Sequence, residues 1–402
     1  DCELYNAHNT NNAGFGVYGF YNNYLKILNT EIHNVALDGI YVANEPNIEI
    51  GYVNISDVNR RYFVNSNQSI SSGDGIQLDG YWDGFHIHHT TIDRTNGAGN
   101  KYNLILSSGG SSQFASGILE YNTFLNDSIL PTAVHIEHGD GIVTRYNTFK
   151  GSTQGIRLGG AGTSNNLIHN NIFYDSVDGI RVGYIYTAGV SPIGPAIGTK
   201  IFNNVFYNVS QYHITVDKAE VEARNNIHLR PSGITTGVAL HNFGGGSWTL
   251  TNNLYGDVAT AGTPGTGTNA VIGNPLFVNA GAYDFHLQSG SPAINAGTNV
   301  NLTTDFDGVS IPQGGIPDIG AYEYNGILGV STYYFTQKLE LGSKGDEVKE
   351  LQKILISKGY LKGLPDGIFG NYTLEAVKKY QKDNNLEPDG LVGPKTREVL
   401  NR

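Results

Sequence analysis

The sequence is poor in features that mark several common protein classes. Its 402 residues include one cysteine, Cys2, and only 15% of them are charged. A single cysteine excludes an internal disulfide and leaves a stray thiol or an intermolecular link. No apolar run approaches the length of a membrane span, and no signal peptide precedes the first repeat. The sequence therefore predicts no membrane span.

Basic residues are also scarce. Lys and Arg total 25 against 36 Asp and Glu, which gives a formal net charge of −11. Nucleic-acid binding needs a basic stripe that displaces counterions, so we expect no nucleic-acid partner. The chain opens inside a repeat, at Asp1, without a methionine. We interpret this start as that of a mature or trimmed product that has lost its original N-terminal cap.

Glycine is abundant, with 53 residues, and two short motifs recur. The first ends in Asn, a variable residue and an aromatic or apolar one. Its copies are Tyr121–Phe124, Tyr146–Phe149, Asn170–Phe173, Asn203–Phe206, Asn225–His228 and Asn252–Tyr255. They recur every 22 to 33 residues. Such a period, with short strands between turn residues, is typical of a parallel β-solenoid whose coils stack about 4.8 Å apart.

The second motif alternates apolar and variable residues after a glycine or small residue. Its eight copies are Asp38–Val42, Asp74–Leu78, Tyr102–Leu106, Thr132–Ile136, Gln154–Leu158, Asp178–Val182, Tyr212–Val216 and Thr236–Leu240. Period-two alternation points Ile156 and Leu158 inward and leaves Gly155, Arg157 and Gly159 outward.

The Asn column of the first motif is predicted to be structural. Each amide is expected to bond the coils above and below and to satisfy backbone groups that no water reaches. The aromatic that follows is expected to stack in the core.

The outward positions of the second motif form two predicted columns. The middle position reads Tyr41, Gln77, Ile105, His135, Arg157, Arg181, Thr215 and Ala239. Two residues further on, it reads Ala43, Asp79, Ser107, Glu137, Gly159, Gly183, Asp217 and His241. A water-facing column is normally Thr, Ser, Asn or Lys, whereas this one gathers charge over three coils, with Lys101 one coil away.

Stacked arginines repel each other, so an anion is expected beside Arg157 and Arg181. Glu137 supplies one, and an acidic sugar bound by bidentate contacts supplies another. The alternative is a solvated ion pair between Glu137 and Arg157 without function. Another histidine group, His86 to His89, falls in a different column, where metal binding is disfavoured without a nearby carboxylate.

Two mechanisms fit the charged column. In β-elimination, Arg157 or Arg181 neutralises a uronate carboxylate and His135 or Lys101 takes the proton. In hydrolysis, Asp79 and Glu137 form a carboxylate pair two coils apart, on the order of 10 Å. Elimination uses more of the charges and is preferred. The predicted substrate-binding residues come from the same face and from long inserts at about 59–73 and 183–199, and they are Gln77, Tyr41, Tyr184, Tyr186 and Arg61.

Residues 259–325 follow another pattern, with Asn274–Phe277, Ser291–Gly297 and Pro317–Tyr324. It resembles the terminal segment of secreted right-handed parallel β-helix (pectin lyase-like) proteins, which closes the solenoid. This resemblance implies a mainly β, right-handed parallel β-helix over 1–325. It also implies polysaccharide lyase, glycoside hydrolase or uronan epimerase activity, although the catalytic motifs of polygalacturonases, pectate lyases and alginate epimerases are absent. Asp305-x-Asp307-Gly308 looks like the start of a calcium loop, but an ordinary turn is favoured. No cofactor is predicted.

After a linker at 326–337, residues 338–402 carry Lys and Glu at helical spacing and predict three helices. Asp366–Thr373 and Asp389–Thr396 share the pattern Asp-Gly-x-x-Gly-x-x-Thr. With Leu341-Gly342, Leu351-Gln352 and Gly359-Tyr360, they resemble the three-helix peptidoglycan-binding domain. The resemblance implies a cell-wall ligand, and the candidate groove residues are Asp366, Phe369, Thr373 and Asp389.

These patterns together predict a secreted protein at the cell-wall surface that acts on an acidic polysaccharide, with peptidoglycan as a second partner. Two other classes stay open: a non-catalytic glycan-binding adhesin, and a fibre-forming subunit.

Overall fold

The computed structural model describes residues 2–5, 15–20, 24–35, 38–56, 58, 73–95, 102–107, 116–126, 132–160, 163–183, 196–231, 237–257, 265–324, 335–358, 360–361 and 365–400. The chain divides into two compact units. One comprises Asp1–Leu276 with Gly290–Glu323, and the other comprises Phe277–Ser289 with Tyr324–Arg402. The predicted linker lies mostly outside the described residues, so the predicted domain boundaries stay a prediction.

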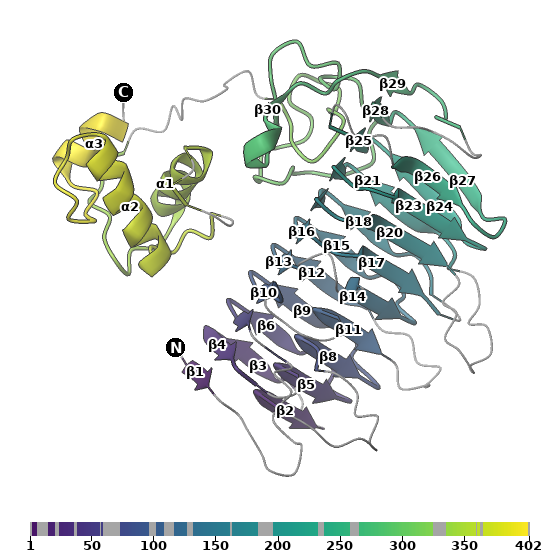
Figure 1. Ribbon diagram of the computed structural model, residues 1–402, viewed down its shortest axis with the longest axis horizontal. Coiled ribbons are helices and arrows are strands. Elements are labelled where there is room, and N and C mark those ends of the chain that lie inside the picture. Colours follow the sequence, from purple (N-terminus) through teal and green to yellow (C-terminus); the bar gives the residue numbers. More distant parts are fainter. Residues whose placement is uncertain are drawn as a thin grey trace. The chain divides into compact units, whose positions relative to one another are not determined.

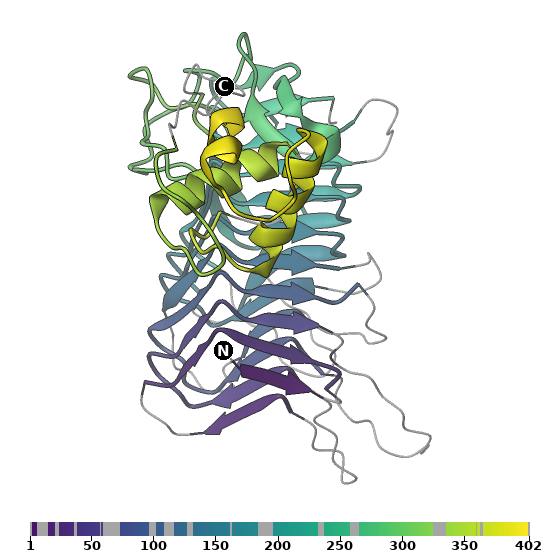
Figure 2. The same cartoon turned by 90° about the vertical axis from the view of Figure 1, so that its left-hand side faces the viewer.

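The first unit is a stack of coils, visible in Figures 1 and 2 from the purple N-terminal strands to the green ones. Over the described residues, it forms three long sheets, here called A, B and C, with 11, 9 and 9 strands, and each complete coil adds one parallel strand to each. Sheet A holds β1 (Cys2–Tyr5), β4 (Thr30–His33), β7 (Asn54–Ser56), β10 (Thr91–Asp93), β13 (Thr123–Leu125), β16 (Thr148–Lys150), β19 (Ile172–Tyr174), β22 (Val205–Tyr207), β25 (Ile227–Leu229), β28 (Leu254–Gly256) and β29 (Val271–Ile272). The predicted parallel β-helix is confirmed.

The other two sheets complete the coils. Sheet B holds β2 (Val17–Phe20), β5 (Ile40–Ala43), β8 (Ile76–Asp79), β11 (Leu104–Ser107), β14 (Thr132–Glu137), β17 (Gln154–Gly159), β20 (Asp178–Gly183), β23 (Tyr212–Asp217) and β26 (Val238–Asn242). Sheet C holds β3 (Lys26–Leu28), β6 (Glu49–Gly51), β9 (Phe85–His88), β12 (Gly117–Glu120), β15 (Val143–Arg145), β18 (Leu167–His169), β21 (Thr199–Phe202), β24 (Glu220–Arg224) and β27 (Ser247–Thr251).

The core runs along the inside of the coils. Ile156 and Leu158 of β17 are buried, as the alternation predicts, while Arg157 between them is only half-buried. The predicted outward position of Gly155 is wrong. A Cβ there would lie 2.7 Å from the Gly179 carbonyl oxygen and equally close to the Phe173 ring. The residue is a glycine because the corner between sheets A and B has no room for a side chain.

The predicted asparagine ladder is confirmed. The amides of Asn122, Asn147, Asn171, Asn204, Asn226 and Asn253 are buried, and each bonds the next at 3.0 Å. The side-chain oxygen also accepts the backbone N–H of the preceding Asn, as between Asn171 and Asn147 at 2.9 Å. The ladder therefore satisfies backbone groups at a dry turn where a plain strand ladder would leave them unpaired.

The aromatic stack beside the ladder is confirmed as well. Phe124, Phe149, Phe173 and Phe206 stack with centroids 4.6 to 5.0 Å apart. His228 and Tyr255 extend the stack at 5.1 Å per step.

Several imidazoles are sealed in this fold, which predicts acid lability. Burial lowers the pKa of His213 to about 3 and of His169 to about 4, and it lowers the pKa of His228 in the same direction. Unfolded histidine titrates near 6.5, so the unfolded chain takes up more protons below that pH. The contribution of these histidines to stability is therefore complete above about pH 6.5. Below that pH the free energy of unfolding falls by about 1.4 kcal/mol per pH unit for each histidine, until the pH reaches the pKa of that histidine in the folded state.

The variant His228→Phe tests this sensitivity, because a phenyl ring continues the stack between Phe206 and Tyr255 without a titrating group. We expect a pH slope about 1.4 kcal/mol per unit shallower between pH 6 and 4, measured by urea unfolding. An unchanged slope would place the acid sensitivity elsewhere.

The terminal segment 290–323 packs along the side of the coils. Side-chain amides at the corner between sheets C and A donate to its carbonyls: Asn252 to Ala296, Asn225 to Thr298, Asn203 to Asp318 and Gly320, and Asn170 to Ala321. The Tyr146 hydroxyl bonds Thr304 one coil further on. The predicted closing segment was 259–325. For residues 290–323 the expected place at the end of the solenoid is corrected, because their partners belong to five successive coils, whereas β29 (Val271–Ile272) of the same segment pairs with β28 as the last strand of sheet A.

The second unit combines a β-hairpin with three helices among its described residues. The hairpin consists of β30 (Phe277–Asn279), the 3₁₀-helix η1 (Ala280–Ala282) and β31 (Asp284–Leu287). The helices are α1 (Asp346–Ser357), α2 (Asn371–Asp383) and α3 (Pro394–Leu400), as predicted. Their core includes Val348, Leu351, Phe369, Val377 and Tyr380.

Candidate functional site

The strand pairing of sheet B brings most of the predicted charged column into one row on its outer face. Tyr41, Gln77, Ile105, His135, Arg157, Arg181 and Thr215 pair across neighbouring strands. The last predicted member is wrong, since Thr215 pairs with His241 and Ala239 is fully buried. Glu137 pairs with Gly159, and Gly183 with Asp217, in the parallel column.

His135 is not the surface residue that its outward position predicted. Its exposed fraction is 3%, and the Tyr102 ring packs edge-on against it at 4.7 Å. Burial, helped by the positive charge of Arg157, lowers the pKa of His135 to about 3. The imidazole is therefore neutral at ordinary pH and a poor proton acceptor. Its Nε2 lies 3.3 Å from Glu137 Oε1.

Arg157 is a half-buried cation that forms no salt bridge with the residues that the structure describes. Within the described part of the chain, no carboxylate oxygen lies within 4.0 Å of its guanidinium, and its buried Nε has no hydrogen-bond partner. Burial lowers its pKa, and the like charge of Arg181 adds to this effect. Among the described residues, the predicted ion pair between Glu137 and Arg157 is therefore not formed, although the negative charge of Glu137 acts on the guanidinium from a longer distance.

Arg181, unlike Arg157, has a carboxylate partner. Its Nη2 lies 3.7 Å from Asp217 Oδ2, and its guanidinium carbon lies 5.7 Å from the Phe243 ring centroid. Asp217 and Phe243 were not among the predicted site residues. Asp217 was in the predicted column but was not chosen, because its strand lies one coil beyond the arginines.

Glu137 and Asp79 are the carboxylates on the strands before the arginines, β14 and β8. Burial, with the negative charge of Asp79, raises the pKa of Glu137, while Ser107 at 3.4 Å and Arg157 oppose the shift. Asp79 accepts a hydrogen bond of 3.2 Å from the Tyr41 hydroxyl. Burial first and Asp79 second raise the pKa of Tyr41 to about 12, so this hydroxyl is a donor.

Four predicted residues, Lys101, Tyr184, Tyr186 and Arg61, lie outside the described residues. Gln77 lies half-buried in the column, between Tyr41 and Ile105. Tyr102 was missed because nothing in the sequence marks its position, two residues before β11, as close to His135.

The separate histidine group lies on sheet C and does have carboxylate neighbours. His86 Nε2 lies 3.0 Å from Glu120, and His88 Nε2 lies 3.5 Å from Glu49. Arg145 also binds Glu120 at 2.7 Å. In the described ranges, no three His, Cys, Asp or Glu side chains are grouped to hold a metal ion. We interpret this group as an ion-pair network.

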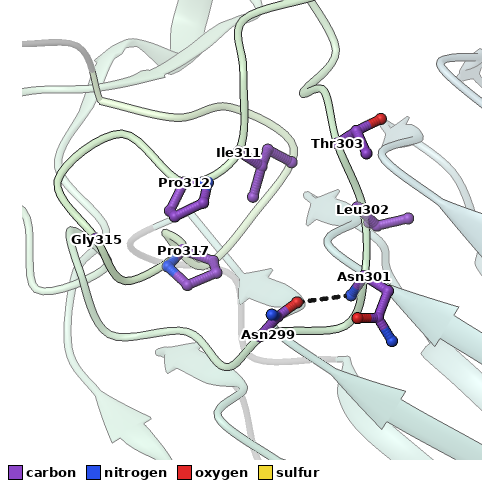
Figure 3. A pocket seen from close by; sticks show the side chains of 8 residues that line it. All are labelled: Asn299, Asn301, Leu302, Thr303, Ile311, Pro312, Gly315 and Pro317. Carbon is purple, nitrogen blue, oxygen red and sulfur yellow. Dashed lines mark hydrogen bonds between the residues drawn. The ribbon is translucent and has the colours of Figure 1, made fainter.

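The Asp305 turn is held by backbone donors. Its carboxylate accepts the N–H groups of Asp307, Val309 and Glu323 at 2.7 to 2.9 Å. Those contacts explain the residue as a turn-forming one, and a calcium requirement stays a prediction. Beside this turn lies a pocket of about 350 Å³ (Figure 3). Its lining is Asn299, Asn301, Leu302, Thr303, Ile311, Pro312, Gly315 and Pro317. None of these side chains is an acid or base, so the pocket offers no proton-transfer chemistry.

In the second unit, a buried glutamine organises each Asp-Gly turn. Gln352 Nε2 donates to Asp366 at 2.7 Å and to Thr373 at 3.0 Å. Gln381 repeats this arrangement with Asp389 at 2.8 Å and Thr396 at 3.0 Å. The motif is thus a structural unit that appears twice.

This arrangement changes the candidate groove residues. Phe369 is fully buried and Thr373 is 2% exposed, so direct contact of either with a cell-wall ligand is corrected to a packing role. Asp366 is half-buried and Asp389 is exposed, and their contact with such a ligand stays a prediction.

No helix among the described residues is both long and apolar enough to cross a membrane. Residues 344–400 match the family model described as putative peptidoglycan binding domain. Over 68 residues the chain is 43% identical to the spore cortex-lytic enzyme of Bacillus subtilis (strain 168). The matched stretch covers 17% of this chain and 22% of that protein. Over 66 residues it is 42% identical to the N-acetylmuramoyl-L-alanine amidase CwlL of Bacillus licheniformis, covering 15% and 18%. The chain thus spans about a fifth of the length of these two relatives.

Among solved structures, the chain is similar to the tailspike protein of E. coli bacteriophage HK620 in complex with pentasaccharide. The TM-score is 0.43 at 14% identity, over 64% of this chain and 46% of that one. The strand stacking and the family match together identify the chain as a parallel β-helix with a C-terminal peptidoglycan-binding domain.

Proposed function

We propose that the protein binds and cleaves an acidic polysaccharide on the outer face of sheet B. The observation that carries this proposal is Arg157, a half-buried guanidinium that forms no ion pair with a carboxylate in the described part of the chain. Burying a cation without a counter-ion is costly, so an anionic ligand in that place would be favoured. A uronate carboxylate matches the planar fork of arginine.

β-Elimination is the preferred reaction. Arg157 would pair with the uronate carboxylate and stabilise the negative charge that develops when the C5 proton leaves. The electron pair then forms the C4–C5 double bond, the C4–O bond breaks, and the departing oxygen takes up a proton. The low pKa and burial of His135 disfavour it as the base, which leaves Lys101 and Glu137 as candidates.

Hydrolysis is the second candidate, favoured by the raised pKa of Glu137. A carboxyl group that stays protonated up to a higher pH is suited to donate a proton to the departing oxygen. Asp79 would then activate the attacking water. The two reactions differ in their products. Elimination gives an unsaturated sugar with ultraviolet absorbance, whereas hydrolysis gives new reducing ends without it.

The test is incubation of the full chain with a panel of acidic polysaccharides, following both absorbance and reducing ends. Glu137→Gln is measured beside it and should lose activity if Glu137 is the base or the acid. We expect cleavage of at least one member. Binding without cleavage would instead favour the non-catalytic adhesin. If the protein neither binds nor cleaves any member of the panel, the proposal is refuted.

The C-terminal domain would hold the protein at the cell wall, as a secreted surface protein. Its match to the peptidoglycan-binding family supports this role. We expect the full chain to sediment with insoluble peptidoglycan and not with cellulose. Equal recovery with both would contradict a specific cell-wall role.

A further inference from the structure

The charges on the outer face of sheet B are segregated along the solenoid. The two arginines, Arg157 and Arg181, lie on the adjacent strands β17 and β20. Carboxylates lie on both sides of them, with Glu137 on β14 and Asp217 on β23. Asp79 lies two strands before Glu137, on β8. Positive charge is therefore confined to two coils within the described part of this face.

Only one of the two arginines is available to a ligand carboxylate. Arg181 already has Asp217 at 3.7 Å, whereas Arg157 has no carboxylate within 4.0 Å in the described part. The face thus offers one cationic subsite at Arg157, with Glu137 on the adjacent strand β14 and two residues out of register, because Glu137 pairs with Gly159 and His135 with Arg157.

A polymer laid along the coils would meet this pattern sugar by sugar, because a sugar unit is about as long as one strand spacing, roughly 5 Å. In a homopolyuronate every sugar carries a carboxylate. If one of these pairs with Arg157, the next sugar on one side would bring its carboxylate toward Glu137 on β14, and the next on the other side would bring it to Arg181 on β20, which Asp217 already pairs. Close like charges repel, so a homopolyuronate fits this face poorly.

The surface beyond the arginines suits neutral sugars. Gly159 and Gly183, two residues after the arginines, carry no side chain, although both are buried. At one end, Tyr18 and Tyr41 stack at 5.4 Å, and Tyr18 is 60% exposed. At the other end, Phe243 is 66% exposed. Aromatic rings bind the apolar faces of sugars and do not need a charge on them.

From this charge pattern we infer that the ligand is a heteropolysaccharide in which an isolated carboxylated sugar lies between neutral sugars, and not a homopolyuronate. The inference rests on the proposed function, since it assigns the substrate class of the same face.

The test compares the affinity of the full chain for two oligosaccharides of equal length by calorimetry. One carries a single central glucuronate between neutral sugars, and the other is an oligogalacturonate. We expect the first to bind at least tenfold more tightly at about 0.15 M ionic strength. Asp217→Asn removes a flanking carboxylate and the ion-pair partner of Arg181. It should therefore lower the ratio of the two affinities severalfold. Asp257→Asn, an exposed carboxylate after β28 of sheet A, is the matched control and should leave the ratio unchanged.

The outcomes separate the two claims. Equal affinity for both oligosaccharides, with both weakened by Arg157→Ala, overturns the heteropolysaccharide inference and keeps the proposed function. Affinity that Arg157→Ala does not change, or no binding of either oligosaccharide, overturns both.

Discussion

Asn171→Ala is expected to lower the free energy of unfolding of the β-helix by about 4 kcal/mol. The side chain makes five hydrogen bonds in a fully buried position. Its oxygen accepts the backbone N–H and the amide of Asn147, and its amide donates to Thr144, His169 and Asn204. Alanine leaves these groups unpaired where no water reaches them, and a buried group without a partner costs about 1–3 kcal/mol.

Urea unfolding followed by tryptophan fluorescence measures this effect on the solenoid. Both tryptophans of the chain, Trp82 and Trp248, lie in the first unit, so the signal does not report on the C-terminal helices. Asn54→Ala is the control, because it makes the same chemical change at an exposed strand position and should cost less than about 0.5 kcal/mol. Similar losses for the two variants would contradict a stabilising ladder.

Arg157→Ala is expected to lower kcat/KM on a cleaved polysaccharide by about a hundredfold or more, because the transition-state charge loses its main stabilising cation. Arg157→Lys should recover only part of this loss, since an ammonium lacks the planar fork that contacts both carboxylate oxygens. The fold should tolerate both changes, because Arg157 makes no salt bridge in the described part of the chain.

The measurement is initial-rate kinetics of the full chain, with unfolding curves for each variant. Arg224→Ala supplies the matched control: Arg224 is an arginine of similar burial on sheet C, paired with Glu222. That variant should keep the wild-type rate. If it lost as much activity as Arg157→Ala, general charge and not a local subsite would explain the effect.

Much of the solenoid was predictable because its repeats are local and periodic. The spacing of Asn147, Asn171 and Asn204 predicted a buried ladder, and the structure has it. One register could not be predicted. Sliding β26 by two residues keeps its inward and outward alternation intact, so the pattern could not choose between Ala239 and His241 as the partner of Thr215.

The sequence by itself determined the stacked coils, the inner and outer faces of the strands, and the helical C-terminal domain, because periodicity and turn residues encode these directly. The tertiary structure alone decided that His135 is sealed behind Tyr102, and that the segment 290–323 bonds the side of the coils. It also decided that Arg157 has no described carboxylate partner while Arg181 has one. Burial and ion pairing depend on side chains from distant coils, and their contacts exist only once the chain has folded.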